Sequence, residues 1–554
     1  MNAAARVGLD GADRTRLMEA ARERPLDILV IGAGATGLGV AVDAAQRGHT
    51  VCVVERGDLG AGTSSKSTKL IHGGVRYLKD GQVALVREGL LERGRLFANA
   101  AHIVRPIELV ATAGTAIELA MLSAGLWIYD ALAGRRRVGW SRPRGRAGLR
   151  ADAPGVDAER FAGGVRFFDG QFDDARMLVA LARTALEFCA PVLTRTEAVD
   201  LVRGPGGNVA GIVLRDLETD TTFELRAKAI VNATGAWGDT LRRLDRPQSP
   251  PLLAPSSGAH IVLPGDFLPG DRGVLVPRTS DGRVLFALPF WGHTLIGTTD
   301  VPAPAAPRDP VPSAEEIAFI LETAASVLVR APSRADVLST WSGLRPLVAG
   351  PAASTSKLSR DFAIERAPSG LVTVAGGKWT SYRRMGEAVV RRLERDFKLV
   401  PQQDADTRAL RLAGSPAAKS PGAGSPAERL TAEQAAANAE SRGPFGRNNR
   451  FDHYGSDAPA VRALCASAPH LGLAVHPRLE LLGGEVLWFV RRELARTPMD
   501  VLARRSRALL LDADAAIAAA PEVARLIAAE RGLDEPWAKT ASARFCTRAA
   551  AYRA

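Results

Sequence analysis

The sequence has few cysteines, and none of them stands in a metal-binding or redox pattern. The four thiols, Cys52, Cys189, Cys465 and Cys546, are widely separated and form no CxxC pair. This spacing gives no sign of a small disulfide-stapled domain, and it favours a reducing compartment. Cys52 falls in an apolar stretch that predicts a buried strand, where a small apolar role is expected.

The chain also lacks an uninterrupted apolar run of about 20 residues, the length needed to span a bilayer. The nearest stretch, residues 119–134, is followed by a cluster of arginines: Arg135, Arg136, Arg137, Arg142, Arg144 and Arg146. An apolar helix with a basic flank is typical of contact with a membrane surface, although a buried helix beside a solvated basic loop has the same pattern. Residues 1–24 have no apolar core, so we expect a surface helix or a disordered arm there rather than a targeting signal.

What is present is the composition of a large folded protein. The 554 residues contain 46% hydrophobic and 24% charged side chains, enough for two or three domains. The net charge of +12 suits an anionic substrate or an anionic membrane surface. Nucleic acid is not predicted, because no zinc-finger spacing or RNA-binding motif accompanies the basic residues.

A nucleotide-binding unit opens the ordered part of the sequence. The apolar strand at residues 27–31 leads into Gly32, Gly34 and Gly37, and then into a helical pattern and a second strand that ends at Glu55. Gly32 permits a tight turn, Gly34 lets a pyrophosphate approach the backbone, and Gly37 lets helix and strand pack closely. Glu55 stands where a carboxylate accepts the ribose hydroxyls, which favours NAD or FAD over NADP.

The segment that follows favours FAD. It is rich in Gly, Ser, Thr and Lys, which suits a loop that wraps an extended flavin nucleotide. From this segment we predict cofactor contacts at Thr63, Ser64, Ser65, Lys69, Leu70, His72, Gly73 and Gly74.

Residues 69–78, KLIHGGVRYL, resemble the hallmark of the FAD-dependent glycerol-3-phosphate dehydrogenase family without interruption. Seven further motifs follow in the family's order: QFDDARML, VNATGAW, SGAHIVLP, LIGTTD, SGLRPL, SRDF and VAGGKWTSYRRMGE. One departure is Ser381, where the family more often has threonine, and it keeps the hydroxyl. The resemblance adds Thr234, Gly235, Trp237, Gly377, Lys378 and Thr380 to the expected cofactor contacts.

The pattern and the resemblance together imply an α/β fold with a discontinuous Rossmann-like FAD-binding domain, a mainly antiparallel β substrate domain and a helical C-terminal domain. We expect an N-terminal extension (1–26), and an FAD-binding domain within 27–400 formed by about 27–100, 165–245 and 340–400. The substrate domain would be inserted as about 101–164 and 246–339. A linker (401–448) would lead to the helical domain (449–554), whose residues 486–494 predict a helix with one buried stripe and one charged face.

An alcohol with a nearby phosphate needs cations to hold it and a base to accept its hydroxyl proton. The candidate substrate contacts are Arg76, Tyr77, Arg345, Arg360, Lys378 and Thr380, with Arg345 and Lys378 favoured by their motifs. The candidate bases are His260 and His72, with His260 preferred, because neutral imidazole accepts a proton near physiological pH. A helix beginning near residue 381 would direct its positive end toward the reduced flavin. The catalytic set is therefore His260, His72, Arg345 and Lys378.

The resemblance implies oxidation of sn-glycerol 3-phosphate to dihydroxyacetone phosphate, with electrons passed through FAD to a membrane quinone. The expected location is cytoplasmic, attached peripherally to the inner face of the membrane, and a homodimer is left open. No metal site is predicted. Two alternatives remain: a glycerophosphate oxidase that uses oxygen, and an amino-acid or amine oxidase of the same flavin superfamily.

Overall fold

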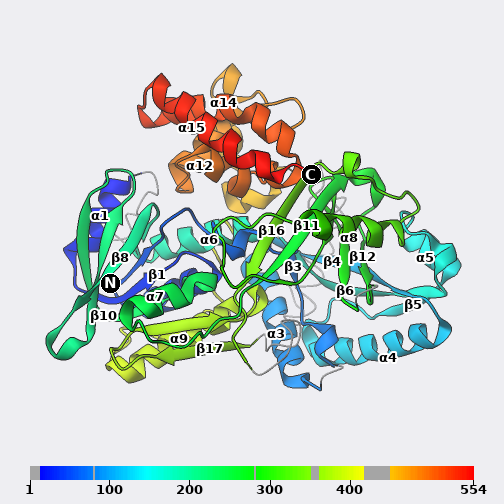
Figure 1. Ribbon diagram of the computed structural model, residues 1–554, viewed down its shortest axis with the longest axis horizontal. Coiled ribbons are helices and arrows are strands. Elements are labelled where there is room, and N and C mark those ends of the chain that lie inside the picture. The colour runs from blue at the N-terminus through cyan, green and yellow to red at the C-terminus, as the bar shows by residue number, and fades with distance from the viewer. Residues whose placement is uncertain (1–12, 79–80, 280–281, 351–360, 417–449) are drawn as a thin grey trace, which may run out of the picture.

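The computed structural model describes residues 13–78, 81–279, 282–350, 361–416 and 450–554. Within these residues the chain forms two β-sheets that lie side by side and a cluster of helices that covers one edge of both (Figure 1). The predicted fold class is confirmed: a mixed α/β flavoprotein architecture with a helical C-terminal region.

The first sheet contains the nucleotide-binding unit. Its main path, in spatial order, is β17 (Phe362–Arg366), β18 (Val372–Gly376), β10 (Thr222–Asn232), β1 (Leu26–Ile31), β2 (Val51–Val54) and β7 (Val192–Leu193). Strands β18, β10, β1, β2 and β7 run parallel, whereas β17 is antiparallel to β18. Both faces of β1 and β2 are buried, which explains why their sequences are almost continuously apolar.

Helices and a hairpin complete this unit. Helix α2 (Ala35–Gln46) connects β1 to β2 and packs closely on α9 (Tyr382–Phe397), where Gly39 and Gly386 let the two backbones meet. Strands β8 (Thr196–Arg203) and β9 (Val209–Asp216) extend the sheet from β10 as an antiparallel ribbon. The predicted N-terminal extension includes α1 (Arg14–Glu23), which packs through Leu17 and Ala21.

The second sheet carries the expected substrate domain. Its strands are β3 (Leu70–Ile71), β4 (Val104–Ala113), β5 (Arg142–Gly145), β6 (Gly163–Phe172), β11 (Ser256–Pro264), β12 (Gly273–Val276), β13 (Leu285–Phe290), β14 (His293–Gly297), β15 (Val301–Pro302) and β16 (Ser339–Arg345). Every pairing recorded among these strands is antiparallel except that of β4 with β12. The predicted domain boundaries stay a prediction, but β3, β6 and β16 pair in this sheet although their residues fall largely in ranges assigned to the FAD-binding domain.

Further α-helices lie around the sheets. They are α3 (Val83–Asn99), α4 (Ala116–Ala133), α5 (Arg146–Asp152), α6 (Asp174–Glu187), α7 (Gly238–Asp245) and α8 (Ala314–Ala325). In the C-terminal region they are α11 (Ala458–Ala466), α12 (Gly483–Arg492), α13 (Ala508–Leu511), α14 (Ala513–Arg531) and α15 (Glu535–Ala549). Most of the predicted linker lies outside the described residues, and its first part is attached to the protein by the bond from the Leu412 amide to the Asn99 carbonyl.

Helix α12 differs from its expected amphipathic form. All residues from Gly483 to Val490 are buried, so the helix has no charged outer face over that length. It ends at Arg492, and the chain then turns before a π-helical segment, Asp500–Arg505. At the end of the helix Arg491 and Arg492 are exposed, whereas Glu493 is buried and accepts from Arg176 at 2.5 and 2.8 Å.

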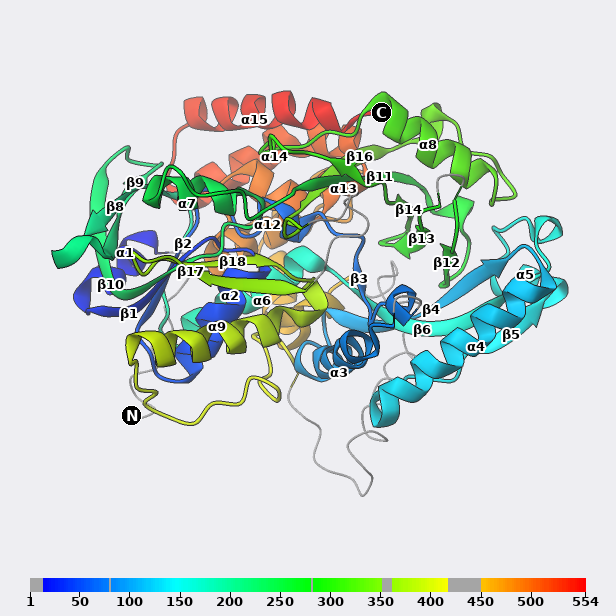
Figure 2. The ribbon, with the colours of Figure 1, turned by 60° about the horizontal axis from the view of Figure 1, so that its bottom comes forward.

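Helix α4 lies at the outer rim of the second sheet, far from α15 (Figure 1, Figure 2). By length and composition alone, the helical stretch Ala116–Arg136 could cross a membrane. The sequence pattern does not predict a span there, because its apolar residues do not form an uninterrupted run of about 20. Its inner face is nevertheless packed in the protein: Leu126 and Tyr129 are buried, and the Tyr129 hydroxyl bonds to Asp169 at 2.9 Å. The helix is therefore a surface helix with one face held by the fold.

Candidate active site

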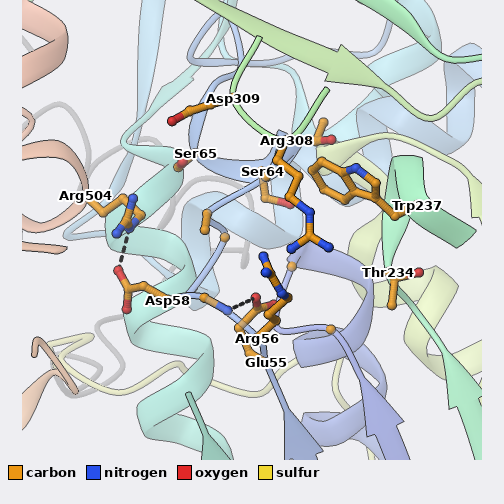
Figure 3. A pocket seen from close by; sticks show the side chains of 18 of the residues that line it. Glu55, Arg56, Asp58, Ser64, Ser65, Thr234, Trp237, Arg308, Asp309 and Arg504 are labelled. Atoms are coloured by element: carbon orange, nitrogen blue, oxygen red, sulfur yellow. Dashed lines mark hydrogen bonds and ion pairs between the residues drawn. The ribbon is translucent and has the colours of Figure 1, made fainter. Parts of the chain in front are cut away.

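A cavity of about 1540 Å³ begins at the carboxyl ends of β1, β2 and β10 and extends to the C-terminal helices. Open α/β sheets bind ligands at this edge. Figure 3 shows the central part, where side chains from both ends of the chain surround one space. Predicted cofactor residues in its lining are Gly32, Gly34, Glu55, Thr63, Ser64, Ser65, Thr234, Gly235, Trp237, Gly377 and Lys378.

The glycine turn has different steric demands at each position. Gly32 has φ +108°, and a Cβ there would stand 2.6 Å from the Ala233 carbonyl oxygen. A Cβ at Gly37 would overlap the carbonyl oxygen of Gly32. At Gly34 only the Ser64 hydroxyl, 3.2 Å away, would touch a Cβ, so the fold itself does not require glycine there. The backbone at Gly34 is thus left open to the cavity.

Glu55 lies at the end of β2 and accepts two backbone hydrogen bonds. Its carboxylate accepts from the Ala33 amide at 2.9 Å and from the Gly57 amide at 2.7 Å. Burial raises the pKa of the Glu55 carboxyl, and these two amides act in the opposite direction. One carboxylate therefore fixes the glycine turn and also borders the cavity.

The loop after β2 forms the next part of the wall. The Ser64 hydroxyl accepts from the Ala35 amide at 3.0 Å, at the start of α2, and the Ser64 carbonyl accepts from the Trp379 indole at 2.8 Å. The Thr63 hydroxyl oxygen is buried and has no hydrogen-bond partner among the described residues. Because buried polar atoms are normally paired, this hydroxyl is suited to bind a polar atom of a ligand.

Trp237 lies in the opposite wall of the cavity and bonds to the loop at residues 306–309. Its indole donates to the Ala306 carbonyl at 2.9 Å, and Figure 3 shows Arg308 beside the ring, directed toward Arg56. The next residue of this loop, Asp309, accepts from Lys66 at 2.9 Å and from Arg548 of α15 at 3.0 Å. These charges hold the pKa of Asp309 at about 2 despite burial, so the attachment is ionic at physiological pH.

Four predicted site residues meet where β3 approaches α9. Lys378 lines the cavity, and its ammonium group stands 3.9 Å from the centre of the Tyr77 ring. The Thr380 hydroxyl pairs with the backbone of His72, accepting from its amide at 3.3 Å and donating to its carbonyl at 3.2 Å. Thr380 thus joins two chain segments as well as standing beside Lys378.

His260 and Arg345 lie on neighbouring strands, β11 and β16. His260 is buried, stacks on Trp341 at 4.1 Å, and its Nε2 is 2.9 Å from the Thr68 hydroxyl. Burial, followed by the positive charges of Lys69 and Arg345, lowers the pKa of His260 well below 6.5. The ring is therefore neutral at physiological pH.

The Arg345 guanidinium is held by the strand ends around it. It donates to the Thr298 hydroxyl at 2.9 Å, to the Thr299 carbonyl at 2.9 Å and to the Ser257 carbonyl at 3.2 Å. Because a Cβ on Gly258 would collide with the guanidinium, that glycine makes room for it. The side chain is rigidly oriented before any ligand arrives.

Several predicted residues lie behind the cavity wall rather than in its lining. Lys69 and Leu70 are buried, the Gly73 amide donates to the Tyr129 hydroxyl at 2.7 Å, and Gly74 faces the Tyr77 ring with φ +85°. Their direct cofactor contacts stay a prediction. Arg360 lies outside the described residues, as does the side chain of Arg76.

The sequence reasoning missed two kinds of residue. Trp341 and Thr68, which stack on and bond to His260, stand inside or beside motifs, but nothing local signals their role. The C-terminal region supplies Arg504, Arg548 and Tyr552 to the cavity wall. Arg504 pairs with Asp58, at the other end of the chain, and this separation leaves no sequence signal.

Two family models match the chain. The one described as FAD dependent oxidoreductase matches residues 27–392, and the one described as the C-terminal domain of alpha-glycerophosphate oxidase matches residues 407–537. The mitochondrial glycerol-3-phosphate dehydrogenase of Arabidopsis thaliana is 38% identical over 95% of this chain and 86% of its own length. That of Homo sapiens is 35% identical over 92% of this chain and 71% of its own length.

The chain belongs to the FAD-dependent glycerol-3-phosphate dehydrogenase family. The glycerol-3-phosphate dehydrogenase of Bacillus halodurans, solved with FAD, is 28% identical and superposes with a TM-score of 0.77 over 98% of both chains. The L-alpha-glycerophosphate oxidase of Mycoplasma pneumoniae is 17% identical, covers 70% of this chain and 98% of its own, and has a TM-score of 0.55, so it shares the fold.

FAD, the cofactor of this family, fits the cavity residues. The volume of about 1540 Å³ exceeds that of most small-molecule sites and accommodates an extended dinucleotide. The residues that would hold it include the open backbone at Gly34, the carboxylate of Glu55 and the unpartnered Thr63 hydroxyl.

Alanine at Gly37 and at Gly34 should separate folding from cofactor binding. Gly37→Ala forces a methyl group into the Gly32 backbone, so we expect a loss of about 3 kcal/mol or more in the apoprotein's stability. Gly34→Ala meets only a movable hydroxyl, so its unfolding midpoint should stay near that of the wild type while FAD affinity falls. Urea unfolding of the apoproteins and fluorescence titration with FAD measure both. Equal destabilisation by the two variants would contradict this assignment.

Proposed function

We propose that this protein oxidises sn-glycerol 3-phosphate to dihydroxyacetone phosphate and passes the electrons to a membrane quinone. Support comes from similarity to dehydrogenases of this name over more than nine tenths of the chain, in both of its family regions. The site is consistent with this substrate, because an anionic alcohol needs a cation beside the cofactor. Lys378 in the cavity wall is the observation that carries the proposal.

Lys378 is our candidate for holding the substrate phosphate next to the flavin. It follows Gly376 and Gly377 at the end of β18, so the same turn that lines the cofactor cavity presents the ammonium group. Tyr77 lies under that group and keeps it directed along the ring face. Arg345 would contribute a second, pre-oriented positive charge from β16.

The oxidation removes a hydride from the carbinol carbon and a proton from its hydroxyl. FAD, when bound, supplies the acceptor for the hydride. The proton needs an acceptor, and His260 is our candidate because its ring is neutral, with its pKa held well below 6.5 by burial. The ring is buried, so its connection to the substrate would run through the Thr68 hydroxyl to which Nε2 is bonded.

The first test is the requirement for phosphate. Under anaerobic conditions glycerol 3-phosphate should bleach the flavin and glycerol should not. Lys378→Met removes a charge-assisted contact of about 1.5–3 kcal/mol, which should weaken apparent substrate affinity about tenfold or more. The control is Lys228→Met, which removes an exposed lysine paired with Asp27. Equal bleaching by glycerol, or unchanged affinity in Lys378→Met, would count against the proposal.

The second test identifies the base. His260→Asn should keep the fold and the flavin but slow flavin reduction by about 10²–10⁴-fold, the usual cost of removing a general base. Because the pKa of His260 lies well below 6.5, protonation of this ring should not slow wild-type reduction between pH 8 and pH 6.5. Stopped-flow reduction across that range measures this. A limb near pH 6.5 that disappears in His72→Asn would assign the base to His72 instead.

We also propose peripheral attachment to an anionic membrane, at its inner, cytoplasmic face, because a lipid-soluble quinone has to be reached there. The outer face of α4 exposes Ile117, Met121, Trp127 and Ile128, each about half exposed or more. Arginines follow directly, and Arg137 stacks on the exposed Trp140 at 3.9 Å. An apolar stripe with a basic flank is the arrangement that binds an anionic lipid surface.

Removing this stripe should detach the protein without harming the flavin site. Met121→Asp with Ile128→Asp should lower binding to anionic liposomes at least tenfold and slow quinone-dependent turnover, while flavin reduction by glycerol 3-phosphate stays unchanged. A matched control is Val400→Asp with Leu473→Asp, which charges two equally exposed apolar side chains elsewhere. Replacing Arg135, Arg136 and Arg137 by Gln should weaken binding by about 1 kcal/mol per charge and reduce its salt dependence.

Sedimentation with liposomes and turnover assays with a quinone analogue or oxygen measure these effects. Wild-type protein that stays in solution beside anionic liposomes and turns over rapidly with oxygen would favour a glycerophosphate oxidase.

A further inference from the structure

The C-terminal region inserts one arginine into the interior behind the cofactor loop. Arg507 precedes α13, has φ +65°, and is 1% exposed. Its guanidinium donates to the Ser65 carbonyl at 2.8 Å, to the Asp174 carboxylate at 2.9 Å and to the Ala503 carbonyl at 3.1 Å. Two of these three acceptors belong to the flavin-binding half of the molecule.

Lys69 approaches the same two acceptors from another segment. Its ammonium group donates to the Ser65 carbonyl at 2.9 Å and to both oxygens of Asp174 at 2.7 and 2.8 Å. The Ser67 amide and hydroxyl also donate to Asp174, at 2.9 and 2.7 Å. Asp174 therefore gathers three chain segments, and it is fully buried.

Two buried carboxylates face the two cations of this cluster, because the Arg507 guanidinium also lies 3.7 Å from Asp173. Burial raises the pKa of Asp174, but Lys69 and Arg507 reverse this and hold it below its ordinary value. Burial and then the charge of Arg507 lower the pKa of Lys69 to about 7, while Asp174 and Asp173 act in the opposite direction. Lys69 also stands 4.9 Å from the centre of the Trp341 ring, on which His260 stacks.

The segment held by these cations is the wall of the cofactor cavity. Residues 62–66 line the cavity, and the Ser64 hydroxyl accepts from the first turn of α2. The Ser64 carbonyl accepts from Trp379, and Thr68 bonds to His260. The loop at residues 62–69 thus contacts helix α2, the turn that contains Lys378, and His260. On the side away from the cavity, Asp174 binds the same loop.

We propose that Arg507 is a positioning residue through which the C-terminal helical region holds residues 62–69 in the shape that binds the cofactor. The guanidinium joins the Ser65 carbonyl to Asp174, so the loop cannot move away from α6 while the C-terminal region is in place. Tight FAD binding then depends on the C-terminal helical region, which supplies Arg507 to the buried side of this loop. This role is independent of which alcohol is oxidised, so the substrate tests above do not decide it.

Arg507→Met in the full-length protein removes the bonds and keeps much of the volume. Because Lys69 and the Ser67 amide and hydroxyl still donate to Asp174 in this variant, the fold should survive. We expect FAD to dissociate at least ten times more readily, measured by fluorescence titration of the apoprotein. Amide hydrogen exchange within residues 62–69 should be at least ten times faster, with α14 and α15 unchanged. The matched control is Arg491→Met, which removes an exposed arginine paired with Glu530 in the same domain.

The pH dependence of the free energy of unfolding gives a second measurement, which a general loosening of the fold would not reproduce. Unfolded Lys69 binds its proton up to about pH 10.5, whereas folded Lys69 releases it near pH 7, so its contribution to stability grows as pH rises between these values. Without the repulsion from Arg507, the folded pKa rises and this gain with pH should shrink in Arg507→Met but not in Arg491→Met.

If Arg507→Met does not fold, Arg507→Lys decides the matter, because it keeps the charge on a shorter side chain that cannot reproduce the three guanidinium bonds: FAD affinity should fall below that of Arg491→Met. FAD affinity and exchange at residues 62–69 equal to those of Arg491→Met would overturn the proposal. Faster exchange spread evenly through the C-terminal helices would also overturn it, since it indicates a general loss of packing.

Discussion

Buried charge has to be neutralised by a partner, and this requirement joins the two ends of the chain. Buried ion pairs link the flavin-binding half to the C-terminal helices. They are Asp58 with Arg504 and Arg505, Arg176 with Glu493, and Asp174 with Arg507. Removing one member of such a pair typically costs about 3–5 kcal/mol, because the remaining charge is left buried and unpaired. The pairs therefore fix the relative position of the two regions more strictly than apolar packing would, and the cofactor cavity lies between them.

Regular patterns made the first sheet predictable. Its strands and helix are local, since continuous apolar runs and the Gly32–Gly37 spacing depend only on neighbouring residues. The glycine turn, the acidic residue after β2 and the choice of FAD followed from the stretch 27–78. The end of helix α12 was harder: Arg491 and Arg492 are exposed, but Glu493 is buried because it pairs with Arg176, more than 300 residues earlier in the chain, and the sequence gives no sign of this pairing.

The candidate site was predictable as a set of motifs but not as a geometry. Lys378, Tyr77, His72 and Thr380 do come together, because β3 and the turn before α9 approach the same place. Sequence alone could not tell that Lys69 would be paired with Asp174 rather than exposed to the cofactor, although both stand in family-like motifs. It also gave no reason to choose Trp341 as the partner of His260, since that contact depends on the register of β11 with β16.

The loop that carries Asp309 has a bearing on the order in which the protein is assembled. Asp309 is bound to Lys66 and to Arg548 of α15, so part of the cavity wall comes from a helix that is synthesised long after the nucleotide unit. Domains generally begin to fold from the N-terminal side during synthesis. A nascent chain thus lacks part of the cavity wall until its last helices emerge. The cofactor site is complete only when both ends of the chain have folded against each other.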